Sequence, residues 1–375
     1  MRVLHINCNY IGTTLHQLMI EKLDQLGIDN QVFVPTYDKH MAVIRPNSNV
    51  CVCECFKKWD RIAFDYKQQK IQRALERNIS VTDFDVIHAY TLFTDGNCAR
   101  NLSKKYKIPY VVAVRNTDVN DFFRLMPHLR GRGVQIMRDA AAVFFLSDSY
   151  QRQVFEKYIP QKYQKEIREK TQVIPNGIDE FWFENKCEDA KYLDKNAVKL
   201  VYAGRIDKNK NIRTTQNAMK ILRKQGIETT LTVVGKVQDQ KEFKRIQEDV
   251  HTTCLPAMSK EELINVYRAS DIFVMPSFTE SFGLVYAEAM SQGLPVIYSK
   301  GQGFDGQFPE GVAGFHVECH NAKACAGAIE KIAMNYQTIS RNCILNTEKY
   351  QWRAICKQYK KLYYEIAHGA AKESY

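Results

Sequence analysis

The sequence predicts an α/β protein that contains two doubly wound parallel-sheet domains. Short apolar segments alternate with longer amphipathic segments, and this alternation occurs twice, on either side of a polar stretch at residues 179–197. Alternation of this kind produces parallel sheets with helices on both faces. The 375 residues are enough for two such domains, each with its own core. We expect the two domains to face each other across a cleft.

The first run contains six predicted strands, each short and apolar as buried parallel strands are. They lie at residues 2–7, 30–35, 84–90, 110–116, 141–147 and 171–176. Residues 14–27 and 94–107 are amphipathic and are predicted to form helices between strands. Residues 51–55, "CVCEC", suggest either a metal site or one face of a strand. The strand is favoured, because no second ligand cluster follows at usable spacing.

The second run contains six further predicted strands with the same character. They lie at residues 198–205, 229–236, 252–257, 271–277, 294–300 and 313–317. A helix is predicted to begin near Ser259, because "SKEE" has the Ser and Glu spacing of a capping box.

The composition limits the classes of partner. A net charge of +11 favours an anionic partner. Nucleic acid is a poor candidate, because acids are interspersed with the bases and no recognition module is visible. No apolar run approaches the roughly 20 residues of a membrane span. The opening residues predict a strand and not a signal peptide. The eleven scattered cysteines predict reduced thiols and a cytoplasmic protein.

Residues 122–138 mix basic and apolar side chains. Arg124, Arg130, Arg132 and Arg138 alternate with apolar residues, and no acid lies between the first and the last of them. This pattern fits a helix that docks on an anionic membrane surface. A solvated helix with one partly buried face fits it equally well.

Ligands of open parallel sheets bind beyond the carboxyl ends of the strands, and polar loops follow several predicted strands of the second run. Gly204, Arg205 and Lys210 follow residues 198–203 directly, and the two cations form an unopposed pair that could hold a diphosphate. A lysine-rich surface loop is the alternative. Gly235 ends another strand, and Leu255–Pro256 end a third, where backbone groups could contact the edge of a flat base.

Residues 276–297, "PSFTESFGLVYAEAMSQGLPVI", place two glutamates in an apolar setting. Residues 281–283 lie where a helix should start, so free N–H groups there could bind phosphate. Glu280 and Glu288 are eight residues apart, which on a helix puts them on about the same face. We expect Glu280 to accept hydrogen bonds from sugar hydroxyls and Glu288 to bind a ribose diol. Salt-bridged structural glutamates are the alternative.

At these residues the chain resembles glycosyltransferase family 4, the retaining enzymes of the GT-B fold. Glu280 and Glu288 match the family's Glu-x7-Glu element, and "YAGRIDKNKNI" at residues 202–212 is similar to its Arg/Lys loop. "VIPNGID" at residues 173–179 is similar to its interdomain segment, and residues 350–366 are similar to its closing helix. The resemblance covers residues 170–365 well and the N-terminal half mainly in architecture.

The resemblance implies two Rossmann-like domains, an N-terminal acceptor-side domain at residues 1–181 and a nucleotide-sugar-binding domain at 182–352. A terminal helix at 353–375 would cross back to the first domain. The implied reaction is retaining, hexosyl-type transfer from a nucleoside-diphosphate sugar to a saccharide or lipid-linked acceptor. The expected setting is synthesis of cell-surface polysaccharide or glycoconjugate, in the cytoplasm or at the inner face of the membrane. No metal or cofactor is expected.

The resemblance also implies roles for particular residues. Arg205 and Lys210 would neutralise the leaving diphosphate, and Glu288 would bind the ribose. Glu280 would hold the transferred sugar. The residues that would bind the sugar and the distal phosphate with it are Ser281, Phe282, Gly283, Leu284 and Val285.

The N-terminal half departs from the family pattern. The family's glycine-rich loop is represented by "NYIGTTLHQL" at residues 9–18, with Gly12 as its single glycine. Where many members carry a histidine, this chain has a loop that includes Arg115 and Asp118, and we expect these residues to contact substrate. His88 could line the cleft instead, or it is an ordinary strand-end histidine.

Three other functions are possible for the same architecture. A nucleotide-sugar epimerase does not have this Glu-x7-Glu motif, and a phosphorylase would need a pyridoxal-bearing lysine and a longer chain. A non-catalytic nucleotide-sugar-binding subunit remains an alternative, because the loop "RNTDVN" at residues 115–120 differs from the family pattern.

Overall fold

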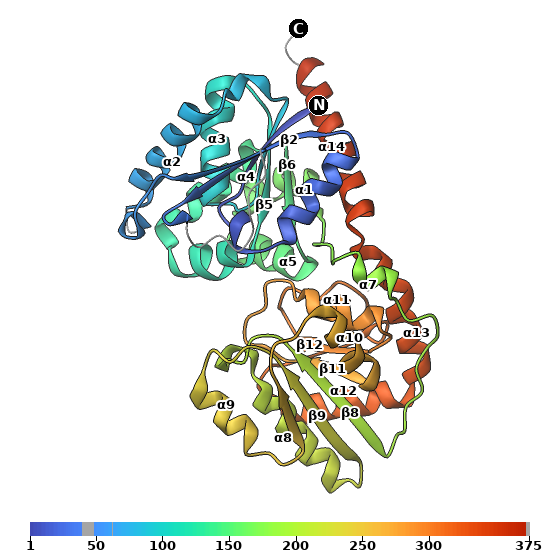
Figure 1. Cartoon of the computed structure of the whole chain (residues 1–375). Coiled ribbons are helices and arrows are strands. Elements are labelled where there is room, and N and C mark those ends of the chain that lie inside the picture. The colour runs from blue at the N-terminus through green and yellow to red at the C-terminus, as the bar shows by residue number, and fades with distance from the viewer. Residues whose placement is uncertain (40–48, 62, 373–375) are drawn as a thin grey trace. The chain divides into compact units, whose positions relative to one another are not determined.

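A computed structural model describes residues 1–39, 49–61 and 63–372. The chain divides into two compact units (Figure 1). Unit 1 comprises residues 1–146, 150–177 and 352–375, and unit 2 comprises residues 147–149 and 178–351. The sequence-based boundaries were placed after residues 181 and 352. Each unit contains one parallel sheet, so the predicted fold class is confirmed.

Unit 1 is built on a seven-stranded parallel sheet with the strand order β3-β2-β1-β4-β5-β6-β7. Its strands are β1 (Arg2–Ile6), β2 (Asp29–Thr36), β3 (Val50–Glu54), β4 (Val86–Ala89), β5 (Tyr110–Val114), β6 (Ala142–Phe145) and β7 (Thr171–Val173). Its helices include α1 (Leu15–Gln25), α2 (Phe64–Asn78), α3 (Thr94–Tyr106), α4 (Arg130–Asp139), α5 (Asp148–Lys157) and α6 (Gln161–Glu169).

Both faces of this sheet are covered, which explains the continuous apolar runs in its central strands. Strand side chains alternate between two core clusters, so Leu4 packs with residues of α2 and α3, whereas Val3 packs with residues of α1. The "CVCEC" segment forms the edge strand β3, in agreement with the favoured strand interpretation. All eleven cysteines lie in the described ranges and are free thiols.

The terminal helix α14 (Trp352–Lys372) belongs to unit 1, as predicted. Ile355, Tyr359 and Tyr363 are buried in the same cluster as residues of α1. The Trp352 ring lies against Gly177, where a Cβ would come within 2.5 Å of the indole. The apolar face of α14 is therefore part of the unit 1 core. In the part of the chain that the structure describes, no helix combines the length and apolarity needed to cross a membrane.

Unit 2 is built on a six-stranded parallel sheet with the order β10-β9-β8-β11-β12-β13. Its strands are β8 (Ala197–Ala203), β9 (Glu228–Val234), β10 (Thr252–Leu255), β11 (Ile272–Met275), β12 (Val296–Ser299) and β13 (Gly314–Val317). Its helices are α7 (Phe181–Glu184), α8 (Ile212–Lys224), α9 (Gln240–Gln247), α10 (Lys260–Ala269), α11 (Leu284–Ser291), α12 (Ala322–Met334) and α13 (Tyr336–Asn346). The helix predicted near Ser259 is α10, and Ser259 and Glu262 form its capping box.

Candidate functional site

The carboxyl ends of three neighbouring strands of unit 2 are joined through their backbones. The Gly204 N–H donates to the Val234 carbonyl at 2.9 Å, and the Gly235 N–H donates to the Leu255 carbonyl at 3.1 Å. A Cβ on Gly235 would lie 1.6 Å from the Gly204 oxygen. Only glycine at position 235 permits this approach. Gly235 therefore determines how closely the loops after β8 and β9 approach each other.

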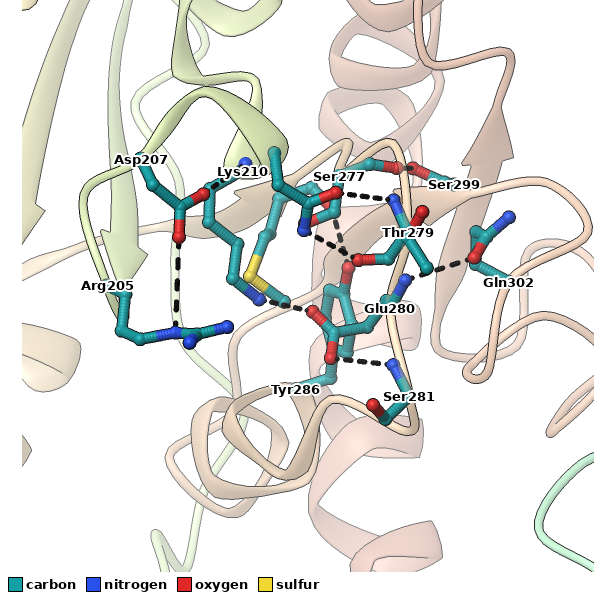
Figure 2. Close-up of polar contacts among 12 residues, drawn as sticks. Arg205, Asp207, Lys210, Ser277, Thr279, Glu280, Ser281, Tyr286, Ser299 and Gln302 are labelled. Atoms are coloured by element: carbon teal, nitrogen blue, oxygen red, sulfur yellow. Dashed lines mark hydrogen bonds and ion pairs between the residues drawn. The ribbon is translucent and has the colours of Figure 1, made fainter. Parts of the chain in front are cut away.

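The loop between β8 and α8 carries a lysine that is held by an ion pair. Asp207 accepts a hydrogen bond from the Lys210 backbone N–H at 3.1 Å. The Lys210 Nζ lies 2.6 Å from the Glu280 Oε2, and each side chain is only 11% exposed (Figure 2). The prediction that Arg205 and Lys210 form an unopposed pair of cations is therefore wrong for Lys210. A carboxylate from a second loop holds its charge in place.

Arg205 has a different environment from Lys210. Its side chain is 61% exposed, and its Nε is 4.0 Å from the Asp207 Oδ2 (Figure 2). An exposed pair at this distance contributes little. The guanidinium can therefore turn toward an anion in solution at small cost.

Asn209, which the sequence did not single out, joins the β8–α8 loop to the β11–α11 loop. Its Nδ2 donates to the Thr279 carbonyl at 2.8 Å, and its Oδ1 accepts from the Thr279 N–H at 3.0 Å. Its backbone carbonyl accepts from the Phe278 N–H at 2.8 Å. These three bonds lie immediately before Glu280 in the chain. They fix the position of that carboxylate relative to Lys210.

A third loop, after β12, supports Glu280 from another direction. The Glu280 N–H donates to the Gln302 Oε1 at 3.0 Å, and its carbonyl accepts from the Gly303 N–H at 3.1 Å. The Glu280 Oε1 accepts from the Ser281 N–H at 3.0 Å (Figure 2). Gln302 was also missed from the sequence. Nothing in the local pattern around residue 302 indicates a partner 22 positions away.

The two glutamates do not lie on one helix, which corrects the helical-face argument. Helix α11 begins at Leu284, and Glu280 precedes it in the loop. Gly283 separates them with a φ of 78°, where a Cβ would come within 2.4 Å of the Tyr286 ring. The first N–H groups of α11 have no acceptor within the helix. Whether residues 281–285 bind phosphate remains a prediction.

Glu288 lies within α11 and is partly buried. Burial, and secondarily the nearby Asp179, raise the pKa of the Glu288 carboxyl to about 7, against the opposing effect of Lys260. Lys260 is itself paired with Asp179, with Nζ and Oδ1 2.8 Å apart. Among the described residues, no hydrogen bond or ion pair to the Glu288 carboxylate is formed. This carboxylate is therefore available to a ligand that donates hydrogen bonds.

Asp118, in unit 1, has a carboxylate that is bonded to backbone donors. Its carboxylate is fully buried and accepts hydrogen bonds from the N–H groups of Arg115 (2.8 Å), Leu92 (3.0 Å) and Phe93 (3.2 Å). Burial raises the pKa of Asp118 to about 6. The side chain holds two strand-end loops together, because its oxygens are occupied by backbone donors. Its expected contact with substrate stays a prediction.

The other unit 1 candidates are in mixed environments. The Arg115 side chain donates to the Tyr90 carbonyl at 3.1 Å and to the Asn176 Oδ1 at 3.0 Å. His88 is fully buried within β4 and shares a hydrogen bond of 2.5 Å with the Tyr363 hydroxyl of α14. His88 therefore packs in the core of unit 1, and its contact with a ligand stays an untested prediction. Gly12 ends a short 3-10 helix, and a Cβ there would meet nothing within 4 Å.

Family models match both halves of the chain. The model described as Glycosyltransferase Family 4 matches residues 13–180, and the model described as Glycosyl transferases group 1 matches residues 185–350. The D-inositol 3-phosphate glycosyltransferase of Pseudarthrobacter chlorophenolicus is 28% identical over 336 residues, covering 83% of this chain and 79% of that protein. The enzyme of the same name from Paenarthrobacter aurescens is 26% identical over 379 residues, covering 92% and 91%.

Solved structures show the same fold at low identity. Sucrose-phosphate synthase from Thermosynechococcus elongatus has a TM-score of 0.75 and 19% identity, covering 98% of this chain and all of that one. Anabaena Alr3699/HepE in complex with UDP and glucose has a TM-score of 0.65 and 17% identity, covering 96% and 98%. The two family models together span most of the sequence. The chain therefore belongs to the GT-B glycosyltransferases with family 4 architecture, enzymes that transfer a hexose-type sugar from a nucleotide-sugar donor.

Proposed function

We propose that this protein is a retaining, metal-independent glycosyltransferase whose donor binds at the strand-end loops of unit 2. The observation that carries the proposal is the Lys210–Glu280 pair, 2.6 Å apart and held by three loops. A preorganised cation beside a preorganised carboxylate suits a ligand that carries both phosphate and hydroxyl groups. A nucleoside-diphosphate sugar is such a ligand.

Lys210 can serve the diphosphate while it stays paired with Glu280. An ammonium group has three N–H donors, and Glu280 occupies one of them. The remaining two can reach phosphate oxygens, and the exposed Arg205 guanidinium adds a bidentate donor. Two protein cations then stabilise the charge that develops on the leaving group. This is the reason for proposing that no divalent metal is needed for the chemical step.

Glu280 is proposed to hold the transferred sugar. Its Oε2 faces Lys210 and its Oε1 accepts from the Ser281 N–H. Each carboxylate oxygen can accept a further hydrogen bond, so both can still bind sugar hydroxyls. Glu288, whose carboxylate has no partner among the described residues, is proposed to accept both hydroxyls of the ribose.

Retention is proposed from the resemblance to a family of retaining enzymes. A carboxylate nucleophile would attack the anomeric carbon directly, whereas Glu280, whose oxygens are bonded to Lys210 and the Ser281 N–H, is assigned to the sugar hydroxyls. We propose instead that the acceptor hydroxyl attacks on the face from which the diphosphate departs. The bond from the anomeric carbon to phosphate oxygen breaks, the new glycosidic bond forms, and the hydroxyl proton passes to the departing phosphate.

The acceptor is proposed to be a saccharide or lipid-linked saccharide of cell-surface polysaccharide or glycoconjugate synthesis. The family resemblance alone supports this class. The two enzymes named D-inositol 3-phosphate glycosyltransferase are similar along most of the chain. A phosphorylated polyol is therefore the second acceptor to test.

The proposal is tested by incubating the chain with radiolabelled UDP-, ADP- and GDP-hexoses, with saccharide, lipid-linked or inositol 3-phosphate acceptors, in excess EDTA. We expect one donor to be consumed and the product to keep the donor's anomeric configuration by NMR. Turnover that requires added Mg²⁺, or an inverted product, would contradict the mechanism. Binding of a donor without turnover on any acceptor would favour the non-catalytic subunit.

Contact with an anionic membrane is a further proposal, and few of the basic side chains at residues 122–138 are left for it. Arg132 and Arg138 form ion pairs with Asp65 and Glu166, and the Arg130 Nε donates to a backbone carbonyl. Arg124 and Leu125 remain exposed, with Leu125 65% exposed. We expect flotation with anionic vesicles at low salt, weakened in an Arg124→Ala/Leu125→Ala variant. Equal recovery with neutral and anionic vesicles would exclude this contact.

A further inference from the structure

Three potential metal ligands meet in unit 2, outside the residues proposed to bind the donor. Asp305 and Glu310 lie between β12 and β13, and His316 lies within β13. The His316 Nδ1 is 3.1 Å from the Asp305 Oδ1 and 3.1 Å from the Glu310 Oε1. One ligand atom from each residue lies within 4.8 Å of the other two. The three side chains thus converge on one point.

The charges of this cluster are not balanced by the protein. In the described part of the chain, no lysine or arginine forms an ion pair with Asp305 or Glu310. A single imidazole nitrogen carries at most one proton, so it cannot donate a full hydrogen bond to both carboxylates. Negative charge is therefore concentrated here without a cation to neutralise it.

Supporting hydrogen bonds hold both carboxylates in place. The Gly301 N–H donates to the Asp305 Oδ2 at 2.7 Å, which leaves the Oδ1 directed at His316. The Tyr298 hydroxyl donates to the Glu310 Oε1 at 3.3 Å, and the His316 N–H donates to the Glu310 carboxylate at 3.2 Å. Metal ligands are typically oriented by such outer contacts. Asp305 is 11% exposed, whereas His316 and Glu310 are 31% and 43% exposed, so one side of the cluster is open to water.

We propose that Asp305, Glu310 and His316 bind one transition-metal dication of the zinc class, with water as the fourth ligand. Zinc bonds of about 2.0–2.2 Å to nitrogen and oxygen place tetrahedral ligands about 3.3 Å apart. The 3.1 Å separations around the His316 nitrogen are close to that spacing. An imidazole ligand disfavours Mg²⁺ and Ca²⁺, which take oxygen ligands.

The ion would stabilise the loop beneath the donor site and take no part in the chemistry. Gln302 and Gly303, two or three residues before Asp305, bind the backbone of Glu280. Asp305 fixes the start of the same loop through Gly301. A cation that joins Asp305 to β13 would therefore restrain the segment on which the position of Glu280 depends.

The test is a Zn²⁺ titration by calorimetry of the EDTA-stripped full chain, kept reduced with a phosphine, and repeated with Co²⁺ followed by visible absorption. Removing an outer-shell partner typically weakens metal binding 10–100-fold. His316→Gln and Glu310→Gln should therefore each lower the affinity for one equivalent of Zn²⁺ by at least about 100-fold. Glu318→Gln, an exposed carboxylate paired with Lys300 on the same strand end, is the matched control and should bind as wild type.

The free cysteines also bind zinc, and cobalt distinguishes the two kinds of site. Wild type should bind one Co²⁺ that His316→Gln does not bind. That Co²⁺ should show tetrahedral absorption without a thiolate charge-transfer band. Equal stoichiometry and affinity in wild type and both variants, or no non-thiolate equivalent in wild type, would overturn the proposal. Circular dichroism confirms folding, and the half-exposed Glu310 supplies the decisive variant if His316→Gln is misfolded. No donor is present, so the result is independent of the proposed function.

Discussion

Lys210 and Glu280 are 70 residues apart in the chain, and their contact is the basis of the proposed donor site. The sequence indicated both residues separately, each from its place after a strand. It could not indicate the pair, because no local pattern links two loops so far apart. The pairing changes the expected role of Lys210 from a free cation to a positioned one. A positioned cation costs no reorganisation when charge develops on the leaving group.

We predict that Lys210→Ala lowers turnover on the order of 10²-fold, because it removes one group that stabilises developing charge. The free energy of unfolding should fall by about 1–3 kcal/mol, because the Glu280 carboxylate is left with fewer partners. Steady-state kinetics and thermal unfolding measure the two effects. Lys208→Ala, an exposed lysine on the same loop, is the control and should change neither. A Lys210→Ala enzyme with normal turnover would remove this residue from the mechanism.

If Glu288 binds the ribose as proposed, donor binding should depend on pH. Its pKa of about 7 means that the free carboxyl is protonated below neutrality, whereas ribose hydroxyls donate best to the ionised form. The dissociation constant of a nucleoside diphosphate should therefore rise as pH falls below about 7, by at most tenfold per pH unit for one proton. Calorimetry between pH 5.5 and 8.5 measures it. Because phosphate also titrates in this range, Glu288→Gln is the reference, and an identical pH profile in that variant would contradict the assignment.

At the scale of elements, the strands were predictable and the ligand loops only partly so. The central strands are buried on both faces, so each appears in the sequence as a short apolar run. An example is "IFVM", which forms β11. The eight-residue spacing of Glu280 and Glu288 led to the wrong prediction that both lie on one helix. Gly283 is the N-cap of α11, so Glu280 lies in the loop before the helix. Asn209 and Gln302 act through bonds to distant loops, and such tertiary contacts leave no periodic signal in a sequence.

Gly235 should be the least replaceable glycine at the strand ends of unit 2. A Cβ there would overlap the Gly204 carbonyl oxygen at 1.6 Å, so the backbones of β8 and β9 would have to separate. We predict that Gly235→Ala lowers the free energy of unfolding by more than about 2 kcal/mol. Gly327→Ala, in α12 with nothing within 4 Å, should instead raise it by up to about 1 kcal/mol. Urea denaturation measures both, and equal midpoints for the two variants would contradict the packing described.

At the scale of the whole molecule, the chain returns to its first unit through α14. Trp352, Ile355, Tyr359 and Tyr363 are at most 4% exposed. Burial of each such side chain contributes roughly 1.5–3 kcal/mol, and together they approach the 5–15 kcal/mol of a typical domain. The closing helix was predictable from its resemblance to the family. The burial of His88 beneath it was not, because a strand-end histidine has the same local sequence in either setting.

Truncation after Gln351 should therefore unfold unit 1, although it removes only the last residues of the chain. Circular dichroism and thermal unfolding should show loss of one transition, with the polypeptide becoming insoluble or protease-sensitive in residues 1–177. Truncation after Gly369 keeps every one of the four buried side chains and is the control. A chain that ends at Gln351 and still melts like wild type would show that α14 contributes little.

The central claim is that Glu280 holds the transferred sugar and Glu288 the ribose. Calorimetric titration of the nucleoside diphosphate into wild type, Glu280→Gln and Glu288→Gln tests it most directly, because the diphosphate has the ribose but lacks the sugar. We predict near-normal binding to Glu280→Gln, whose turnover should fall most, and weak binding to Glu288→Gln, whose Michaelis constant should rise most. The reverse order of affinities, or unaltered binding and activity in both variants, would show that these carboxylates are structural.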